Sequence, residues 1–103
     1  MNVEFSKAFV KASKRLSGKM LDSLRRTIVE VKAAKGIQDI SDCKKLVGYR
    51  NIYRIRLGDY RALFTLEIEF SGDTIFFQLI GGIKIRLKIS IFYGEKVVHL
   101  ADF

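Results

Sequence analysis

The stretch NIYRIRLGDYRALFTLEIEF, residues 51–70, decides the fold. It holds two strand-like runs, Asn51 to Leu57 and Tyr60 to Phe70, separated by Gly58-Asp59. A two-residue connection of this kind favours a tight β-hairpin. In that register we expect the pairs Leu57–Tyr60, Arg56–Arg61, Ile55–Ala62, Arg54–Leu63 and Tyr53–Phe64.

Period-two alternation separates the two faces of this hairpin. Arg54, Arg56 and Arg61 share one face, and the opposite face is apolar, with Tyr53, Ile55, Leu57, Tyr60, Ala62 and Phe64. Opposed like charges destabilise a sheet by up to about 1 kcal/mol, so a purely structural sequence has little reason to pair arginines. The pattern therefore indicates an anion site, because each guanidinium offers a planar fork matched to phosphate. The alternative is that the arginines are ordinary solvent-facing residues.

The residues before the hairpin predict one strand and two helices. Asn2 to Phe5 alternates as a strand does, and Ser6 is a suitable N-cap for a helix from about Lys7 to Leu16. A second helix ending near Gly36 is expected, because glycine can supply the left-handed residue that stops a helix. Its apolar stripe consists of Met20, Leu21, Leu24, Ile28 and Val31. We interpret the helical bases as a solvated face rather than a specific contact; they include Lys11, Lys14, Arg15, Lys19, Arg25 and Arg26.

Length and charge narrow the class of protein. A chain of 103 residues fits one domain, and 49% hydrophobic with 29% charged residues is typical of a folded soluble protein. The formal net charge is +8 and the sequence pI is about 9.8, which indicates a polyanionic partner, either nucleic acid or an acidic protein. Residues 7–61 hold 15 Lys and Arg against 5 Asp and Glu, a net of +10, so the first half builds the basic surface.

Cysteine and histidine counts exclude several kinds of site. The single cysteine, Cys43, allows no internal disulfide and no Cys-based zinc site, and we expect it to be a small semi-buried residue. The single histidine, His99, excludes multi-histidine metal sites, and no phosphate loop or dinucleotide motif is present. We therefore expect no metal and no cofactor. Because the N-terminus lacks a long apolar run, we expect no signal peptide or membrane span and a cytoplasmic location.

Residues 44–61, which read KKLVGYRNIYRIRLGDYR, resemble the core signature of the RelE/ParE toxin superfamily. The resemblance extends over about residues 1–80. It implies an α+β fold of two N-terminal helices packed on a twisted antiparallel sheet, in the order β-α-α-β-β-β. It also implies the toxin of a type II toxin–antitoxin pair, with an acidic antitoxin as partner. Members similar to RelE cleave messenger RNA on the ribosome, whereas members similar to ParE poison DNA gyrase.

The Arg-Ile-Arg strand followed by Tyr60-Arg61 is closer to the RelE branch. By this resemblance, Arg54, Arg56 and Arg61 hold the messenger backbone and stabilise negative charge while the ribose 2′-hydroxyl attacks phosphorus. Lys44, Lys45 and Arg50 lie in the same run and are further candidate RNA-binding residues, as are Lys84 and Arg86 beyond the region of resemblance. Each well-placed cation can lower such a barrier by about 3 kcal/mol. Arginine is a poor general base, so the proton acceptor is unassigned.

The C-terminal residues depart from the family pattern, which ends in a cluster of the type His-Arg-x-x-Ile-Tyr. Here an alternating strand from Ile83 to Ile91 is expected instead, followed by a strand from Val97 to Leu100. Lys84 and Arg86 can replace the missing bases, with His99 or Tyr93 as acid, base or stacking group. The opposing interpretation is that His99 is a structural or surface residue, or that the tail arose by a local reading-frame change.

The sequence thus predicts a RelE-like, metal-independent mRNA endonuclease that acts on the ribosome. Two alternatives are a ParE-like gyrase inhibitor and a catalytically weakened member that only binds RNA or its antitoxin. The missing C-terminal cluster is the main support for the weakened member.

Overall fold

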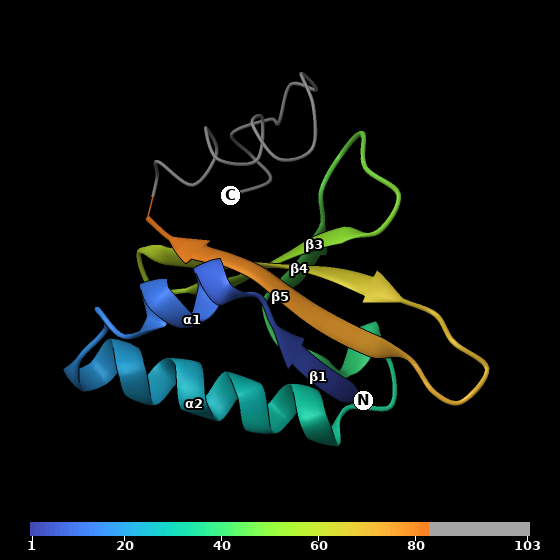
Figure 1. Cartoon of the computed structure of the whole chain (residues 1–103), viewed down its shortest axis with the longest axis horizontal. Helices are drawn as coiled ribbons and strands as arrows, with labels where there is room; N and C mark the ends of the chain where they lie inside the picture. Colours follow the sequence, from blue (N-terminus) through green and yellow to red (C-terminus); the bar gives the residue numbers. More distant parts are fainter. Residues whose placement is uncertain (83–103) are drawn as a thin grey trace.

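The computed structural model describes residues 1–82 and shows two helices packed on one face of a five-stranded sheet (Figure 1). This confirms the expected α+β class with two N-terminal helices. The helices are α1 (Lys7–Ser13) and α2 (Gly18–Ala33), with a short 3₁₀ turn at Ile37–Asp39. The strands are β1 (Asn2–Phe5), β2 (Cys43–Lys45), β3 (Ile52–Leu57), β4 (Tyr60–Glu67) and β5 (Thr74–Gly81).

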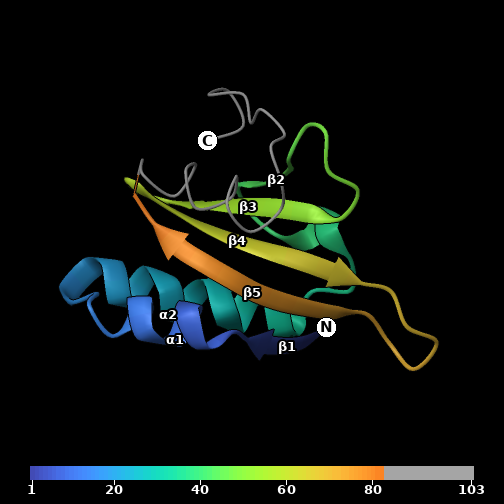
Figure 2. The same cartoon turned by 45° about the horizontal axis from the view of Figure 1, so that its top comes forward.

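The sheet has the order β1-β5-β4-β3-β2, with the two shortest strands β1 and β2 at its edges (Figure 2). One edge differs from the expected antiparallel sheet, because β1 runs parallel to β5 and the sheet is mixed. This parallel pair joins residues about 70 positions apart, such as Asn2 and Thr74, and short-range patterns carry no signal for it. The opposite edge holds β2, an additional strand that the sequence did not predict.

The central hairpin has the predicted register in every expected pair, from Leu57–Tyr60 to Tyr53–Phe64. Gly58 has φ +60, a left-handed conformation that glycine adopts without a steric penalty, which explains its place in the turn. The second strand is shorter than predicted and ends at Glu67, which pairs with Thr74 at the start of β5. Ile68 to Phe70 therefore lie in the loop that projects beyond the sheet (Figure 1).

The helix boundaries follow local hydrogen bonding. Ser6 is the N-cap of α1 as predicted: its Oγ accepts from the Phe9 N–H at 3.0 Å and donates to the Gln78 carbonyl at 2.7 Å. The first helix ends at Ser13 rather than Leu16, because the chain tightens to i→i−3 bonds there. The prediction of a left-handed Gly36 is wrong. Its φ is −160, and the helix already ends where Ala34 becomes extended.

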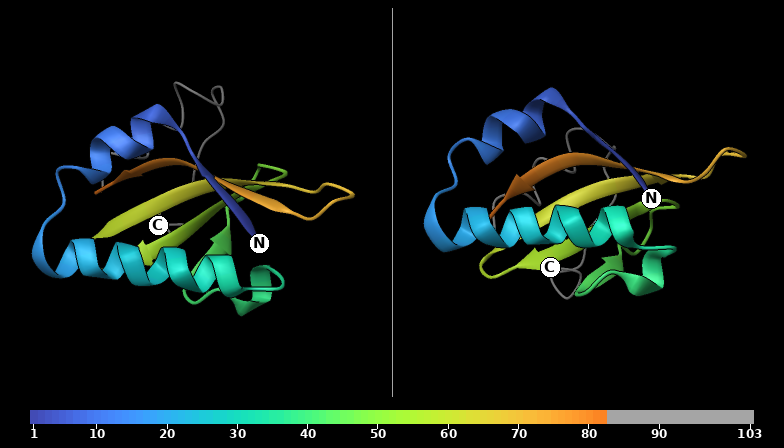
Figure 3. Two further views of the ribbon diagram at one scale, coloured as in Figure 1. Left: turned by 60° about the horizontal axis from the view of Figure 1, so that its bottom comes forward. Right: turned by 90° about the horizontal axis from the view of Figure 1, so that it is seen from below.

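The main core lies between the helices and the sheet (Figure 3). The predicted apolar stripe of α2 faces it, with Leu24 and Val31 fully buried. Phe77 on β5 packs against Phe9 of α1 and Phe64 of β4, with ring centroids 5.1 and 5.8 Å apart. Because this layer covers the apolar side of the hairpin, the arginine-bearing side faces away from the helices.

Candidate nucleic-acid interface

The arginine face is the side of the sheet turned away from the helices, and it holds Arg54, Arg56, Arg61 and Lys44. Arg56 and Arg61 are direct cross-strand partners on β3 and β4, and Lys44 on β2 is the partner of Arg54. Opposed residues in an antiparallel pair have Cβ atoms about 5 Å apart, and alternate residues of one strand are about 7 Å apart. The register therefore sets four cationic side chains in a compact grid, as predicted for the three arginines.

The three arginines differ sharply in their surroundings. Arg54 is only 7% exposed, although it occupies the same alternating pattern in the sequence as its neighbours. Its Nη1 donates to the Asp42 carbonyl at 2.8 Å, and the same carbonyl accepts from the Arg56 N–H at 3.2 Å. Asp42 adopts φ 52, a left-handed conformation that Asp tolerates better than most residues. Arg54 is thus held rigidly by the chain that leads into β2.

Arg61 and Arg56 lie at the hairpin end of this grid. The half-buried Arg61 donates from Nη1 to the carbonyls of Gly58 and Tyr60, both at 2.9 Å, so the turn itself fixes the guanidinium. Arg56 is exposed. The pair combines an oriented cation, Arg61, with a solvent-exposed one, Arg56. A phosphate that approaches from solvent can contact both.

Burial and mutual repulsion act on the titration of these groups. Burial lowers the pKa of Arg54 from its usual value, and the charges of Arg56 and Arg61 lower it further. Burial, followed by the charge of Arg56, likewise lowers the pKa of Arg61. Arginine nevertheless stays protonated in proteins. The grid is therefore a site of concentrated positive potential, and a bound anion reduces the repulsion between its arginines.

An apolar cluster lies beside the arginines on the same side of the sheet. It consists of Leu46, Tyr49, Ile52, Leu63 and Leu79, all less than one-tenth exposed. Leu63 is the cross-strand partner of Arg54, so this cluster lies beside Arg54 on the sheet. The sequence pattern did not reveal this cluster, because its members come from three strands and the loop between β2 and β3.

The other basic residues predicted to bind RNA lie at varied distances from the grid. Lys44 belongs to it, whereas Lys45 pairs with Tyr53 and therefore lies on the helical side of the sheet. Arg50 is exposed in the loop between β2 and β3. The register thus brings only Lys44 of these three residues next to the arginines. Lys84, Arg86, Tyr93 and His99 lie outside the described residues.

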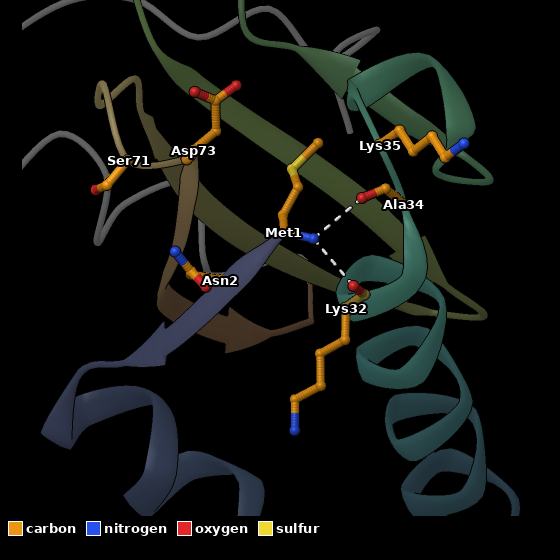
Figure 4. A pocket seen from close by; sticks show the side chains of 8 residues that line it. Met1, Asn2, Lys32, Ala34, Lys35, Ser71 and Asp73 are labelled. Carbon is orange, nitrogen blue, oxygen red and sulfur yellow. Dashed lines mark hydrogen bonds between the residues drawn. The ribbon is translucent and has the colours of Figure 1, made fainter.

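A polar cleft of about 480 Å³ lies at the other end of β5, between the N-terminus, the end of α2 and the β4–β5 loop (Figure 4). The Met1 ammonium donates to the carbonyls of Lys32 at 2.9 Å and Ala34 at 3.0 Å. The cleft begins near Asp73, whereas Arg61 pairs with Gly81, so about 25 Å of strand separates it from the arginines. The cleft is therefore a separate feature from the candidate interface.

The described residues 1–82 offer few other features that bear on function. No cluster of three or more His, Cys, Asp or Glu in this range is arranged for a metal ion. No helix in the same range is long and apolar enough to cross a membrane. Cys43 is half-buried as predicted, and burial raises the pKa of its thiol to about 11, against a smaller opposing effect of Arg54. Its thiol is therefore protonated at neutral pH and is a poor nucleophile.

Comparison with known proteins shows which family the chain belongs to. No protein-family model matches the chain. Toxin RelE3 of Methanocaldococcus jannaschii is 40% identical over 79 residues, which cover 76% of this chain and 85% of that protein. The chain belongs to the RelE toxin family.

Solved structures of RelE proteins share the fold. The chain is similar to the RelB–RelE antitoxin–toxin complex from Methanococcus jannaschii, with a TM-score of 0.64 and 30% identity over 87% of this chain and 98% of that one. The intact Escherichia coli RelBE toxin–antitoxin complex gives a TM-score of 0.60 over 79% of this chain and 94% of that one. Its 22% identity shows a common fold alone.

On this RelE scaffold, the arginine grid can bind a phosphodiester and stabilise charge that develops on it. Cations fixed before the reaction do so without reorganisation, which makes their contribution larger than in water. Proton transfer needs another group, because arginine is a poor proton acceptor and the Cys43 thiol is protonated. Among the predicted residues, His99 and Tyr93 remain the candidates for that role.

Proposed function

We propose that this chain is the toxin of a type II toxin–antitoxin pair and cleaves messenger RNA on the ribosome. The observation that carries the proposal is the opposed Arg56–Arg61 pair, backed by the buried Arg54, in a chain of the RelE family. The Cβ atoms of such an opposed pair lie about 5 Å apart, so both guanidinium groups can reach the non-bridging oxygens of one phosphate. The protein then acts in the cytoplasm, with the ribosomes.

The reaction we propose needs no metal. The ribose 2′-oxygen forms a bond to the adjacent phosphorus, and the bond from phosphorus to the 5′-oxygen of the next nucleotide breaks. The 2′-hydroxyl proton passes to a base, and the leaving oxygen takes up a proton from an acid. Arg56 and Arg61 stabilise the extra negative charge on the phosphorane. Arg54 holds β3 in place through its hydrogen bond to the Asp42 carbonyl.

We further propose that an acidic antitoxin segment covers the arginine face. The solved relatives with this fold are complexes of RelE with RelB, described as its antitoxin. A segment with carboxylates can pair with the same guanidiniums that otherwise hold phosphate, and this would exclude the messenger.

Expression of the chain without an antitoxin tests the enzymatic claim. Wild-type protein is expected to arrest growth and to create new messenger 5′ ends within translated codons. A variant with Ala at positions 54, 56 and 61 is expected to create none. Growth arrest with double-strand DNA breaks and intact messenger would instead indicate a gyrase target. No new ends from wild-type protein would reject the endonuclease, and equal cleavage by the triple variant would reject the residue assignment.

A further inference from the structure

The connection between α2 and β2, residues 34–42, joins the helical layer to the edge of the sheet beside the arginine face (Figure 3). Ile40 is 6% exposed and lies in the main core. Two residues later, Asp42 is exposed, and its carbonyl accepts hydrogen bonds from Arg54 and Arg56 on β3. The connection therefore leads, over a few residues, from the core to the group that holds the arginine grid.

The conformation of Asp42 decides where that carbonyl points. Its φ of 52 is left-handed, which is unfavourable for a residue with a side chain and persists only where neighbouring contacts hold it. The carbonyl oxygen meets two donors, Arg54 Nη1 at 2.8 Å and the Arg56 N–H at 3.2 Å. A contact that fixes the backbone at Ser41 and Asp42 therefore also fixes the Arg54 guanidinium and the backbone of Arg56.

A carboxylate on α2 supplies such a contact. Glu30 is half-buried in the last turn of the helix, and its Oε1 accepts the Ser41 N–H, one residue before Asp42. A hydrogen bond to an ionised acceptor is roughly twice as strong as one between neutral groups. Two hydrogen-bonded steps thus join the helix to the grid, the first from Glu30 to Ser41 and the second from Asp42 to Arg54.

Two neighbouring acids have different places. The Asp39 carboxylate accepts the Lys35 N–H at 3.0 Å, so it stabilises the first part of the same connection. Asp22 is exposed eight residues before Glu30, which is about 12 Å along the helix. Of these three acids, Glu30 is the one that bonds to the peptide next to Asp42.

We propose that Glu30 is a positioning residue for the arginine face, which it orients through Ser41 and Asp42. This inference rests on the proposed function, because the groups that Glu30 orients are those that act on the messenger phosphate. Glu30 lies in the helical layer and acts only through the direction of the Asp42 carbonyl. Its loss should slow the chemical step more than it weakens binding, since a misplacement of about 1 Å can cost 100-fold in rate.

Three variants separate positioning from general stabilisation. Glu30→Ala removes the acceptor of the Ser41 N–H, whereas Glu30→Gln keeps an amide oxygen that can accept it. Asp39→Ala is the matched control, because it removes a carboxylate from the same connection and leaves the contact of Glu30 with Ser41 in place. Circular dichroism and thermal melting verify that all three variants fold.

Amide hydrogen exchange, followed by NMR, tests this path without any reaction. In Glu30→Ala we expect the Arg56 N–H to exchange about tenfold faster than in the wild type, because its acceptor is no longer held. The Leu46 N–H, which bonds to the Ile52 carbonyl at 2.8 Å just beyond the other end of β2, should keep its wild-type rate. Glu30→Gln and Asp39→Ala should leave both rates close to those of the wild type.

Single-turnover cleavage on ribosomes with an empty A site tests the consequence for the reaction. Glu30→Ala is expected to lower the maximal rate about tenfold, while the toxin concentration that gives half of this rate changes by less than about twofold. Glu30→Gln should restore most of the rate, and Asp39→Ala should retain it.

Four results would overturn the inference. Two come from exchange: an unchanged Arg56 rate in Glu30→Ala, or an equal increase in Asp39→Ala. Two come from cleavage: a wild-type rate in Glu30→Ala, or a loss confined to the half-maximal concentration. The exchange measurement needs no cleavage, so the two proposals fail separately. Absence of cleavage by wild-type protein would reject the proposed function, whereas the exchange rates decide whether Glu30 holds the arginine face.

Discussion

The two sides of the sheet carry positive charge in different ways. On the helical side, residues 7–35 hold nine exposed bases and two acids, a net charge of +7. On the other side, the three arginines are focused by strand register, and backbone carbonyls hold Arg54 and Arg61. The residues that contribute most to the pI are therefore different from those best placed for chemistry.

This difference separates binding from catalysis. Exposed lysines on flexible stems act in high dielectric and are screened by salt, so they suit attraction and loose contact. Guanidiniums fixed on a rigid sheet act at lower dielectric and can stabilise developing charge without rearrangement. The two sides of the sheet, and the three arginines, should therefore respond differently to substitution.

The largest expected effect is on messenger cleavage. We expect Arg61→Gln to lower the single-turnover rate on ribosomes by about 100-fold or more, because a fixed cation is lost from the transition state. Binding of the toxin to vacant ribosomes should change far less, since the lost cation acts mainly in the transition state. Quench-flow cleavage and filter binding measure the two quantities. A rate within threefold of the wild type would contradict a catalytic role of Arg61.

Arg56 offers a finer test of the same face. Arg56→Lys keeps the charge at this exposed position but removes the planar fork, so we expect a loss of about tenfold in rate. Arg56→Gln should lose about 100-fold. Single-turnover kinetics on the same ribosome complex compare the two variants. Equal rates for both would show that bidentate geometry does not matter here.

Strand β2 allows the two sides of the sheet to be compared, because Cys43 faces the helices while Lys44 faces the grid. Because burial raises the thiol pKa from 9.0 to about 11, we expect alkylation at pH 8 to be about 100-fold slower than for an ordinary thiol. The folded state holds this proton more tightly than the unfolded state. Stability should therefore fall as pH rises from about 9 to about 11.

Denaturation curves across that pH range measure the linkage. Cys43→Ala removes the titrating group and should flatten the pH dependence. Rapid alkylation of the folded protein, or the same pH dependence in Cys43→Ala, would contradict the proposed environment of the thiol.

Arg54 should differ from its neighbours in its effect on stability. Arg54→Gln removes a buried donor to the Asp42 carbonyl, so we expect a loss of about 1–3 kcal/mol in the free energy of unfolding. Chemical denaturation measures this loss. An unchanged midpoint would show that Arg54 contributes little to the structure.

The smallest expected effect is a gain. Arg56→Gln relieves repulsion from Arg61 and Arg54, so we expect it to raise the free energy of unfolding by a few tenths of a kcal/mol. Arg56→Lys keeps the charge and should leave the stability unchanged. A clear destabilisation by Arg56→Gln would indicate that the like-charge pair is not a cost to the fold.

Local signals predicted the centre of this fold well. The Gly58-Asp59 turn fixes the hairpin register, and that register alone puts Arg54, Arg56 and Arg61 on one face. The spacing of apolar residues from Met20 to Val31 likewise fixes which side of α2 packs on the sheet.

Non-local features were beyond the sequence pattern. The parallel pairing of β1 with β5 and the three-residue strand β2 depend on contacts between distant segments. The burial of Arg54 follows from β2, because Asp42 at its start supplies the carbonyl that binds the guanidinium. For this reason the three arginines look equivalent in the sequence and differ in the structure.

The most direct test uses purified wild-type protein and ribosomes that hold a defined messenger with an empty A site. Primer extension is expected to show cleavage within the A-site codon. Cleavage should require no metal ion other than those that the ribosome itself needs. The same messenger without ribosomes should stay intact. Absence of cleavage on the ribosome, or equal cleavage of free messenger, would contradict the proposal that this chain is a ribosome-dependent endonuclease.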